Sequence, residues 1–232
     1  MHQEVHFKQP AFVRDVIIGL SDGITVPFAL TAGISGAIDN NMIIITAGLA
    51  EICAGAIAMG LGGFLAGKTE EEHYFSELNR EYKEVEEKYE MEKQEVREVF
   101  AEYGLSKELQ DSIADELAKD KDKWVDFMMR YELGLEKPDT KRARKSALNI
   151  AFSYVAGGLI PLMGYVFTAT AAHGLRDSAI ITIICLIVFG YYKSKLTGQK
   201  PFEGAVKTTI IGVLAAAAAF GIAYLFNHGI KG

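Results

Sequence analysis

Apolar residues are concentrated in five runs along this 232-residue chain, and polar segments separate the runs. The runs cover residues 16–37, 42–67, 147–172, 178–192 and 205–226. A helix needs about 20 apolar residues to cross a bilayer, and every run except the fourth reaches that length. The fourth ends in two tyrosines and a lysine, which are typical of an interfacial helix end. The pattern predicts an all-α integral membrane protein with five transmembrane helices.

Lysine and arginine residues are unevenly divided between the two sides of these predicted spans. On one side they precede the first and third runs and surround the turn between the fourth and fifth: Lys8, Arg14, residues 141–145, Lys193, Lys195, Lys200 and Lys207. On the other side lie Arg176 and Lys231. Because basic residues accumulate on the cytosolic side of membrane spans, we expect a cytosolic N-terminus and, with five spans, a luminal C-terminus.

A charged insert separates the second and third runs, so the chain divides into residues 1–67, 68–146 and 147–232. The insert carries 23 of the 30 acidic and 16 of the 24 basic residues, a local net charge of −7. This acidity argues against nucleic acid as a partner and favours cations. We expect a cytosolic helical domain, with helix continuing to Gly104, restarting after Ser106, and covering 107–118 and 123–133.

The first run, DVIIGLSDGITVPFALTAG at residues 15–33, contains a carboxylate within apolar sequence. A charged side chain at the centre of a bilayer costs roughly 2.5 to 3.5 kcal/mol, so Asp22 should face a partner, a cation or a water-filled cavity. Pro27 has no N–H to donate to the carbonyl of Gly23, which leaves a backbone oxygen free beside the carboxylate. Asp22 is therefore a candidate cation site.

The second run carries another acid, Glu51, eight residues before Met59. At 100° per residue the two side chains share a helix face, which offers a carboxylate and a thioether. Gly19 and Gly23 have the spacing that lets helices touch, and packing explains them as readily as function does. The structural alternative for Asp22 and Glu51 is a buried acid with a fixed partner, although few bases occur within the spans.

Within the insert, a pair of glutamates is repeated after eleven residues. Eleven residues make about three helical turns, so the pairs share a face of one helix, or face each other if the helix bends near Glu90. A further acid lies four residues after a methionine, and the candidate metal ligands are Glu81, Glu84, Glu92, Glu95, Met128 and Glu132. The alternative is a solvated face on which these glutamates pair with neighbouring lysines.

Carboxylates with an occasional thioether suit Fe²⁺ or Mn²⁺ before Zn²⁺. The two cysteines, Cys53 and Cys185, lie in apolar runs and are interpreted as small core residues without a disulfide or zinc cluster. The segment EEEH ending at His73 fits E-x-x-H, but the second copy that a di-iron centre needs is missing. Because nucleotide-binding and hydrolase motifs are also missing, we expect neither an enzyme nor a prosthetic group, and transport must use an ion gradient.

The run around Asp22, followed by AEICAGAIAMGLGGFLAG, resembles the vacuolar iron transporter family, and the arrangement of spans and acidic insert is similar to plant-type members over essentially the whole chain. The resemblance implies a homodimer in the vacuolar membrane that exchanges cytosolic Fe²⁺ for protons. Asp22, Glu51 and Met59 match the family's intramembrane pathway. The six insert residues match the ligands of its cytosolic metal-binding domain, where Mn²⁺, Co²⁺ or Zn²⁺ can also bind.

Two functions follow from these patterns. The first is a secondary transporter of a divalent transition metal, with a manganese or calcium exchanger as a variant in substrate. The second is a membrane-anchored metal-binding or ferroxidase-like module, in which the insert carries the function and the spans only hold it at the membrane. Acids and glycine-proline breaks inside the spans favour the secondary transporter, because a simple membrane anchor does not need them.

Overall fold

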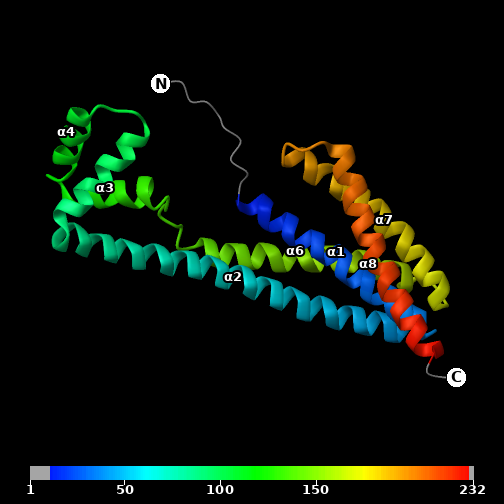
Figure 1. Cartoon of the computed structure of the whole chain (residues 1–232). Coiled ribbons are helices and arrows are strands. Elements are labelled where there is room, and N and C mark those ends of the chain that lie inside the picture. The colour runs from blue at the N-terminus through cyan, green and yellow to red at the C-terminus, as the bar shows by residue number, and fades with distance from the viewer. Residues whose placement is uncertain (1–10, 230–232) are drawn as a thin grey trace. The chain divides into compact units, whose positions relative to one another are not determined.

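The computed structural model describes residues 11–229, and these are helical apart from short connections. Five helices are long and apolar enough to cross a membrane: α1 (Ala11–Ala37), α2 (Asn41–Glu87), α6 (Arg142–Val166), α7 (Ala171–Leu196) and α8 (Pro201–Gly229). Figure 1 labels these five helices, and its colour runs along the chain from blue at α1 to red at the end of α8. The all-helical class is therefore as predicted. Lys8, Lys231 and the N-terminal histidines lie outside the described residues.

The described residues form two compact units, one made of residues 11–64 and 144–229 and the other of residues 65–143. We call the first the membrane unit, because it holds the apolar parts of the five long helices, and the second the insert unit.

Glycines set the packing of α1 against α6 in the membrane unit. A Cβ atom built on Gly19 would lie 2.4 Å from the carbonyl oxygen of Ile150, and one on Gly23 would lie 2.4 Å from that of Tyr154. Each is too close for any side chain, so the two backbones touch and run in the same direction. Helix packing thus accounts for this glycine pair.

Side-chain hydrogen bonds join the helices at one end of the membrane unit. Asp39 accepts from the backbone N–H of Ala171 at 2.8 Å, which ties the end of α1 to the start of α7. Asn41 donates to the carbonyl oxygen of Thr168 at 2.6 Å, and Asn227 donates to that of Ala37 at 2.9 Å. The basic residues of the described membrane unit, apart from Arg176, lie toward the opposite end: Arg14, Arg144, Lys145, Lys193, Lys195, Lys200 and Lys207.

Two predicted spans have the wrong limits. The third was expected over 147–172, but α6 ends at Val166 and a new helix begins at Ala171, where Thr170 caps it by accepting from the N–H of His173. The fourth was expected over 178–192, whereas α7 covers Ala171–Leu196. Its first turns contain polar residues, which a count of apolar positions discards although they form helix equally well.

Helices of the insert unit begin and end close to the predicted positions. The part of α2 that lies in this unit ends at Glu87 and is followed by α3 (Tyr89–Glu102), α4 (Lys107–Leu117), α5 (Lys121–Phe127) and a π-helical turn (Met128–Glu132). Gly104 has φ +76°, the left-handed conformation expected of a residue that ends a helix. The chain breaks at Lys88, which agrees with the bent alternative for the glutamate pairs.

A hydrophobic core holds the insert unit together. Its fully buried members come from every helix of the unit: Tyr74, Val85, Val96, Ala114, Trp124, Val125, Met128 and Met129. Trp124 is the single tryptophan of the sequence and is 2% exposed.

Both cysteines are free, as expected. Cys53 is exposed on α2, however, so its interpretation as a core residue is wrong. A periodic apolar run does not tell which of its faces meets other helices and which is left uncovered.

Candidate functional site

The intramembrane part of the candidate site centres on Glu51. Its Oε1 accepts a hydrogen bond of 2.5 Å from the hydroxyl of Tyr154 on α6, and its Oε2 is buried without a hydrogen-bond partner in the described part of the chain. Gly55 makes this contact sterically possible, because a Cβ there would lie 2.4 Å from the Tyr154 hydroxyl oxygen. Glu51 is thus half satisfied within an apolar helix.

Asp22 lies on α1 and is partly buried. Within residues 11–229 it forms no hydrogen bond or ion pair, so the structure offers it no fixed internal neighbour there. Asp22 precedes Gly23, which packs against the backbone of Tyr154 on α6, and the hydroxyl of the same Tyr154 donates to Glu51. Tyr154 was not among the predicted site residues, because an aromatic residue in an apolar run is usually a packing residue.

Pro27 lies inside α1 without ending the helix. A Cβ on Gly157 would lie 3.1 Å from the carbonyl carbon of Gly23, so the carbonyl that Pro27 leaves free is beside the backbone of α6. Met59 is partly buried on α2, two turns after Glu51. It remains a candidate on the strength of its helical position.

Asp15 is a further acid of α1 that the sequence reasoning passed over. It is 2% exposed, its nearest base is Arg14 at 3.9 Å, and its Oδ1 has no hydrogen-bond partner among the described residues. The packing of α1 against other helices buries it.

Five carboxylates gather in the insert unit. Glu81 on α2 and Glu92 on α3 are 2% and 1% exposed, and the Oε2 atom of each is buried without a hydrogen bond in the described chain. Glu84 and Glu95 are partly buried, and Glu132 lies exposed at the rim. The break at Lys88 lets the two predicted glutamate pairs act on each other across the bend.

Burial and mutual repulsion raise the pKa values of Glu81, Glu92 and Glu132. Burial, followed by the charges of Glu95, Glu81 and Glu84 in that order of importance, raises the pKa of Glu92 to about 8. Partial desolvation of the Glu132 carboxyl group, followed by the charges of Glu95 and Glu81, raises its pKa to about 7. Burial also raises the pKa of Glu81. A cluster of carboxyl groups that repel one another in this way is a candidate binding site for a cation.

Two basic side chains already hold part of this charge. Arg80 contacts Glu77 at 2.8 Å, Glu84 at 3.4 Å and Glu81 at 3.7 Å. Lys88 donates to Glu84 at 2.6 Å, and this bond holds the pKa of Glu84 below its usual value. Both bases are exposed, so a bound cation can displace them at small cost.

Met128 differs from the other predicted ligands. Its side chain is 0% exposed and belongs to the hydrophobic core of the insert unit. The π-helical turn that begins at Met128 changes where Glu132 points relative to an α-helix, and such turns are frequent at functional sites. The spacing of residues in the sequence does not reveal a π-helical turn, because the hydrogen bonds of such a turn span only one residue more than those of an α-helix.

Over residues 11–229, no group of three or more His, Cys, Asp and Glu side chains is arranged to hold a metal ion. The acids of the insert unit share an electrostatic environment but do not meet at one point. Binding a cation would therefore require their side chains to close around it, with Arg80 moving aside.

Five helices of the described chain are long and apolar enough to span a membrane, and two of them, α1 and α2, carry a carboxylate within their apolar sequence. These features define a helical membrane protein. The sequence profile of the VIT family matches residues 13–224, and the chain belongs to this family.

Relatives from plants and yeast align with nearly the whole chain. Vacuolar iron transporter 1 of Oryza sativa subsp. japonica is 52% identical over 96% of this chain and 88% of its own length. The protein of the same name from Arabidopsis thaliana is 50% identical over 98% and 91%. Protein CCC1 of Saccharomyces cerevisiae is 39% identical over 91% and 68%. The resemblance found in the sequence is confirmed, and the family is one of transporters, not enzymes.

Proposed function

We propose that this protein is a secondary transporter that moves cytosolic Fe²⁺ into the vacuole in exchange for protons. The names of the plant relatives supply iron and the vacuole. The proton exchange is our inference from intramembrane acids, which can carry either a metal ion or a proton.

The observation that supports the proposal best is the state of Glu51. One of its oxygens is bound by Tyr154 and the other is buried without a partner in the described structure, inside a helix apolar enough to span a bilayer. An acid kept solely for structure would have both oxygens satisfied. Asp22, which precedes the Gly23 that packs against Tyr154, is the proposed second carboxylate for a passing cation.

In the proposed cycle the insert unit collects the metal and the membrane unit carries it across. Glu81, Glu84, Glu92, Glu95, Met128 and Glu132 are the proposed capture residues. Glu51, Met59 and Asp22 are the proposed pathway. The N-terminus and insert unit are cytosolic, the C-terminus is luminal, and the working form is a homodimer in the vacuolar membrane.

A proteoliposome assay tests the proposal. Purified protein is reconstituted with an imposed pH difference, and uptake of Fe²⁺, Mn²⁺, Co²⁺, Zn²⁺ and Ca²⁺ is compared. We expect Fe²⁺ uptake that requires an opposing proton gradient and releases protons on the metal side. Uptake unaffected by collapsing the gradient would refute proton exchange, and oxygen consumption without uptake would favour a ferroxidase-like module.

Variants assign the pathway. Asp22→Asn and Glu51→Gln keep side-chain size and remove the charge, so we expect each to abolish uptake while the protein still elutes as a folded species. Asp177→Asn is the matched control, since Asp177 lies on α7 and pairs with Arg176 at 2.9 Å. Full uptake by the Asp22 variant would remove that residue from the mechanism.

A further inference from the structure

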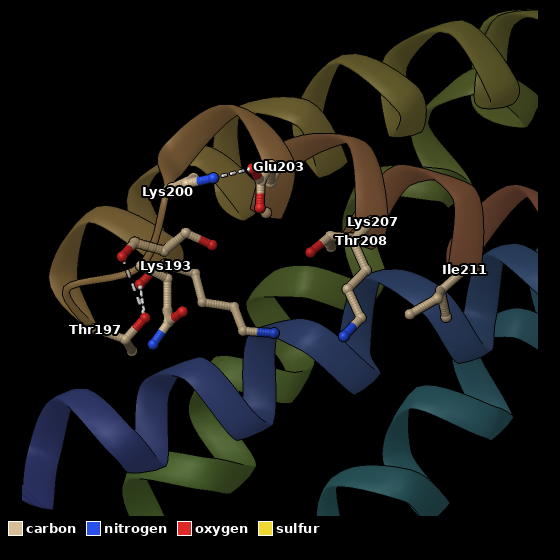
Figure 2. A pocket seen from close by; sticks show the side chains of 10 residues that line it. Lys193, Thr197, Lys200, Glu203, Lys207, Thr208 and Ile211 are labelled. Carbon is tan, nitrogen blue, oxygen red and sulfur yellow. Dashed lines mark hydrogen bonds and ion pairs between the residues drawn. The ribbon is translucent and has the colours of Figure 1, made fainter.

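A polar pocket lies where α7 ends and α8 begins, apart from the candidate transport site (Figure 2). Its volume is about 370 Å³. The turn that forms its outer wall is closed by a hydrogen bond of 2.8 Å from the N–H of Gln199 to the carbonyl oxygen of Ser194, with Gly198 at φ +70°. The pocket is thus built from a defined turn and two helix ends.

Close contact between α7 and α8 fixes the spacing of the pocket walls. A Cβ built on Gly204 would lie 1.6 Å from the Ser194 hydroxyl oxygen, and one on Gly190 would lie 2.8 Å from the carbonyl oxygen of Gly204. The helices therefore touch through their backbones beside the pocket. The lining side chains project from a rigid frame.

The pocket carries an excess of positive charge. Three lysines and one glutamate line it, and Lys200 pairs with Glu203 at 2.7 Å. Lys193 and Lys207 form no ion pair or side-chain hydrogen bond with the residues that the structure describes. Figure 2 shows both side chains reaching into the pocket, from α7 and α8 respectively, with their ammonium groups toward one another. Two like charges left facing each other favour an anion between them.

The remaining lining groups suit a phosphate. The Thr208 hydroxyl and the Gln199 amide also lack hydrogen-bond partners within residues 11–229, and both can donate. The first turn of α8 lies at the pocket as well, and its free N–H groups add positive potential. Ammonium, hydroxyl and amide donors together match the oxygens of a phosphate group.

Exposed apolar side chains lie on the helix ends that form the pocket. Phe202 is 78% exposed, Tyr192 is 58% exposed, and Ile211, which lines the pocket, is 54% exposed. A soluble anion gains nothing from these side chains. A lipid does, because its acyl chains can lie along the apolar surface of α8 while its headgroup enters the pocket.

We propose that this pocket binds the phosphorylated headgroup of an anionic phospholipid, in the leaflet that meets the lysine-rich end of the membrane unit. Basic pockets between helix ends at a membrane surface recognise such headgroups through charge-assisted hydrogen bonds. The site is separate from Glu51 and Asp22, so the inference does not depend on which ion is transported.

Native mass spectrometry of the detergent-purified full chain tests the inference. A phosphatidylinositol monophosphate is titrated against phosphatidylcholine, and the bound fractions are compared. We expect retention of the phosphorylated lipid, and a loss of at least about tenfold in its affinity in the double variant Lys193→Gln/Lys207→Gln, since each lysine near an anionic surface strengthens binding several-fold. Lys195→Gln is the control, because Lys195 is exposed on the same helix but does not line the pocket.

Three results would overturn the inference. Equal binding of both lipids would show that the pocket does not recognise phosphorylated headgroups. An equal loss in the control would indicate diffuse attraction to the basic end instead of a site. If inositol phosphate or inorganic phosphate bound as tightly as the intact lipid in a competition experiment, the ligand would be a soluble anion. All arms are run without iron, so failure here leaves the transport proposal unaffected, and the reverse also holds.

Discussion

Removing a buried carboxylate from the insert unit should stabilise the metal-free protein at neutral pH. Glu92 is 1% exposed, and its pKa of about 8 lies well above the ordinary 4.5. Between these two values the unfolded chain binds fewer protons than the folded chain, so the free energy of unfolding falls as pH rises. Below 4.5 the group has no effect, and above 8 its full penalty is present.

The size of the effect follows from the pKa difference. Each pH unit within the window costs about 1.4 kcal/mol, so raising the pH from 5.5 to 7.5 should lower stability by about 3 kcal/mol. Glu132, whose pKa is about 7, adds pH dependence of the same sign. Glu92→Gln removes the ionisation of Glu92 and should remove that residue's share of the pH dependence.

Trp124 provides the readout, because it is the single tryptophan and lies in the core of the insert unit. Its fluorescence is followed during urea unfolding of the full chain in detergent with a chelator present. We expect the midpoint to fall by roughly 1 to 2 M between pH 5.5 and 7.5 for the unmodified protein, and to change much less for Glu92→Gln.

Glu102→Gln is the control for this experiment, since Glu102 is exposed near the end of the same helix. It should behave as the unmodified protein does. A midpoint that rises with pH, or a Glu92→Gln variant with unchanged pH dependence, would refute the reasoning that buried, mutually repelling acids limit the stability of the metal-free insert unit.

Three further changes test other parts of the site. Tyr154→Phe should leave Glu51 without its donor, which costs about 1 to 3 kcal/mol and should lower Fe²⁺ uptake in proteoliposomes; uptake at the original rate would contradict a role for this bond. Gly55→Ala should displace Tyr154 and lower uptake too, whereas Gly62→Ala should be tolerated, because a Cβ at 62 meets nothing within 4 Å. Arg80→Gln should strengthen Mn²⁺ binding by about two- to fivefold, as surface ion pairs contribute up to about 1 kcal/mol; calorimetry showing weaker binding would mean that Arg80 supports the site.

Much of the fold could be predicted from the sequence, because the length of an apolar run and the position of a glycine are local properties. Gly104 ends a helix where predicted, and the five apolar runs all became long helices. The missed limits of α6 and α7 come from hydrogen bonds that no periodicity encodes, such as the Thr170 cap.

The acids of the candidate site could be proposed from the sequence, but the side chains on neighbouring helices that contact them could not. Asp22 and Glu51 stand out because a charge in an apolar run is costly. Tyr154 and Asp15 do not stand out, since their importance depends on which helix lies opposite. The π-helical turn before Leu133 likewise arises only once the insert unit has folded. The pairing of Lys88 with Glu84, by contrast, has the i,i+4 spacing of a single helix and agrees with the solvated-face alternative drawn from the sequence.

The ties between helix ends have a mechanical consequence. Asp39, Asn41 and Asn227 join neighbouring elements at one end of the membrane unit through side-chain hydrogen bonds to backbone groups. Any rocking of α7 and α8 against α1 has to break these bonds or pivot about them. This end of the membrane unit is therefore the expected pivot of such a motion.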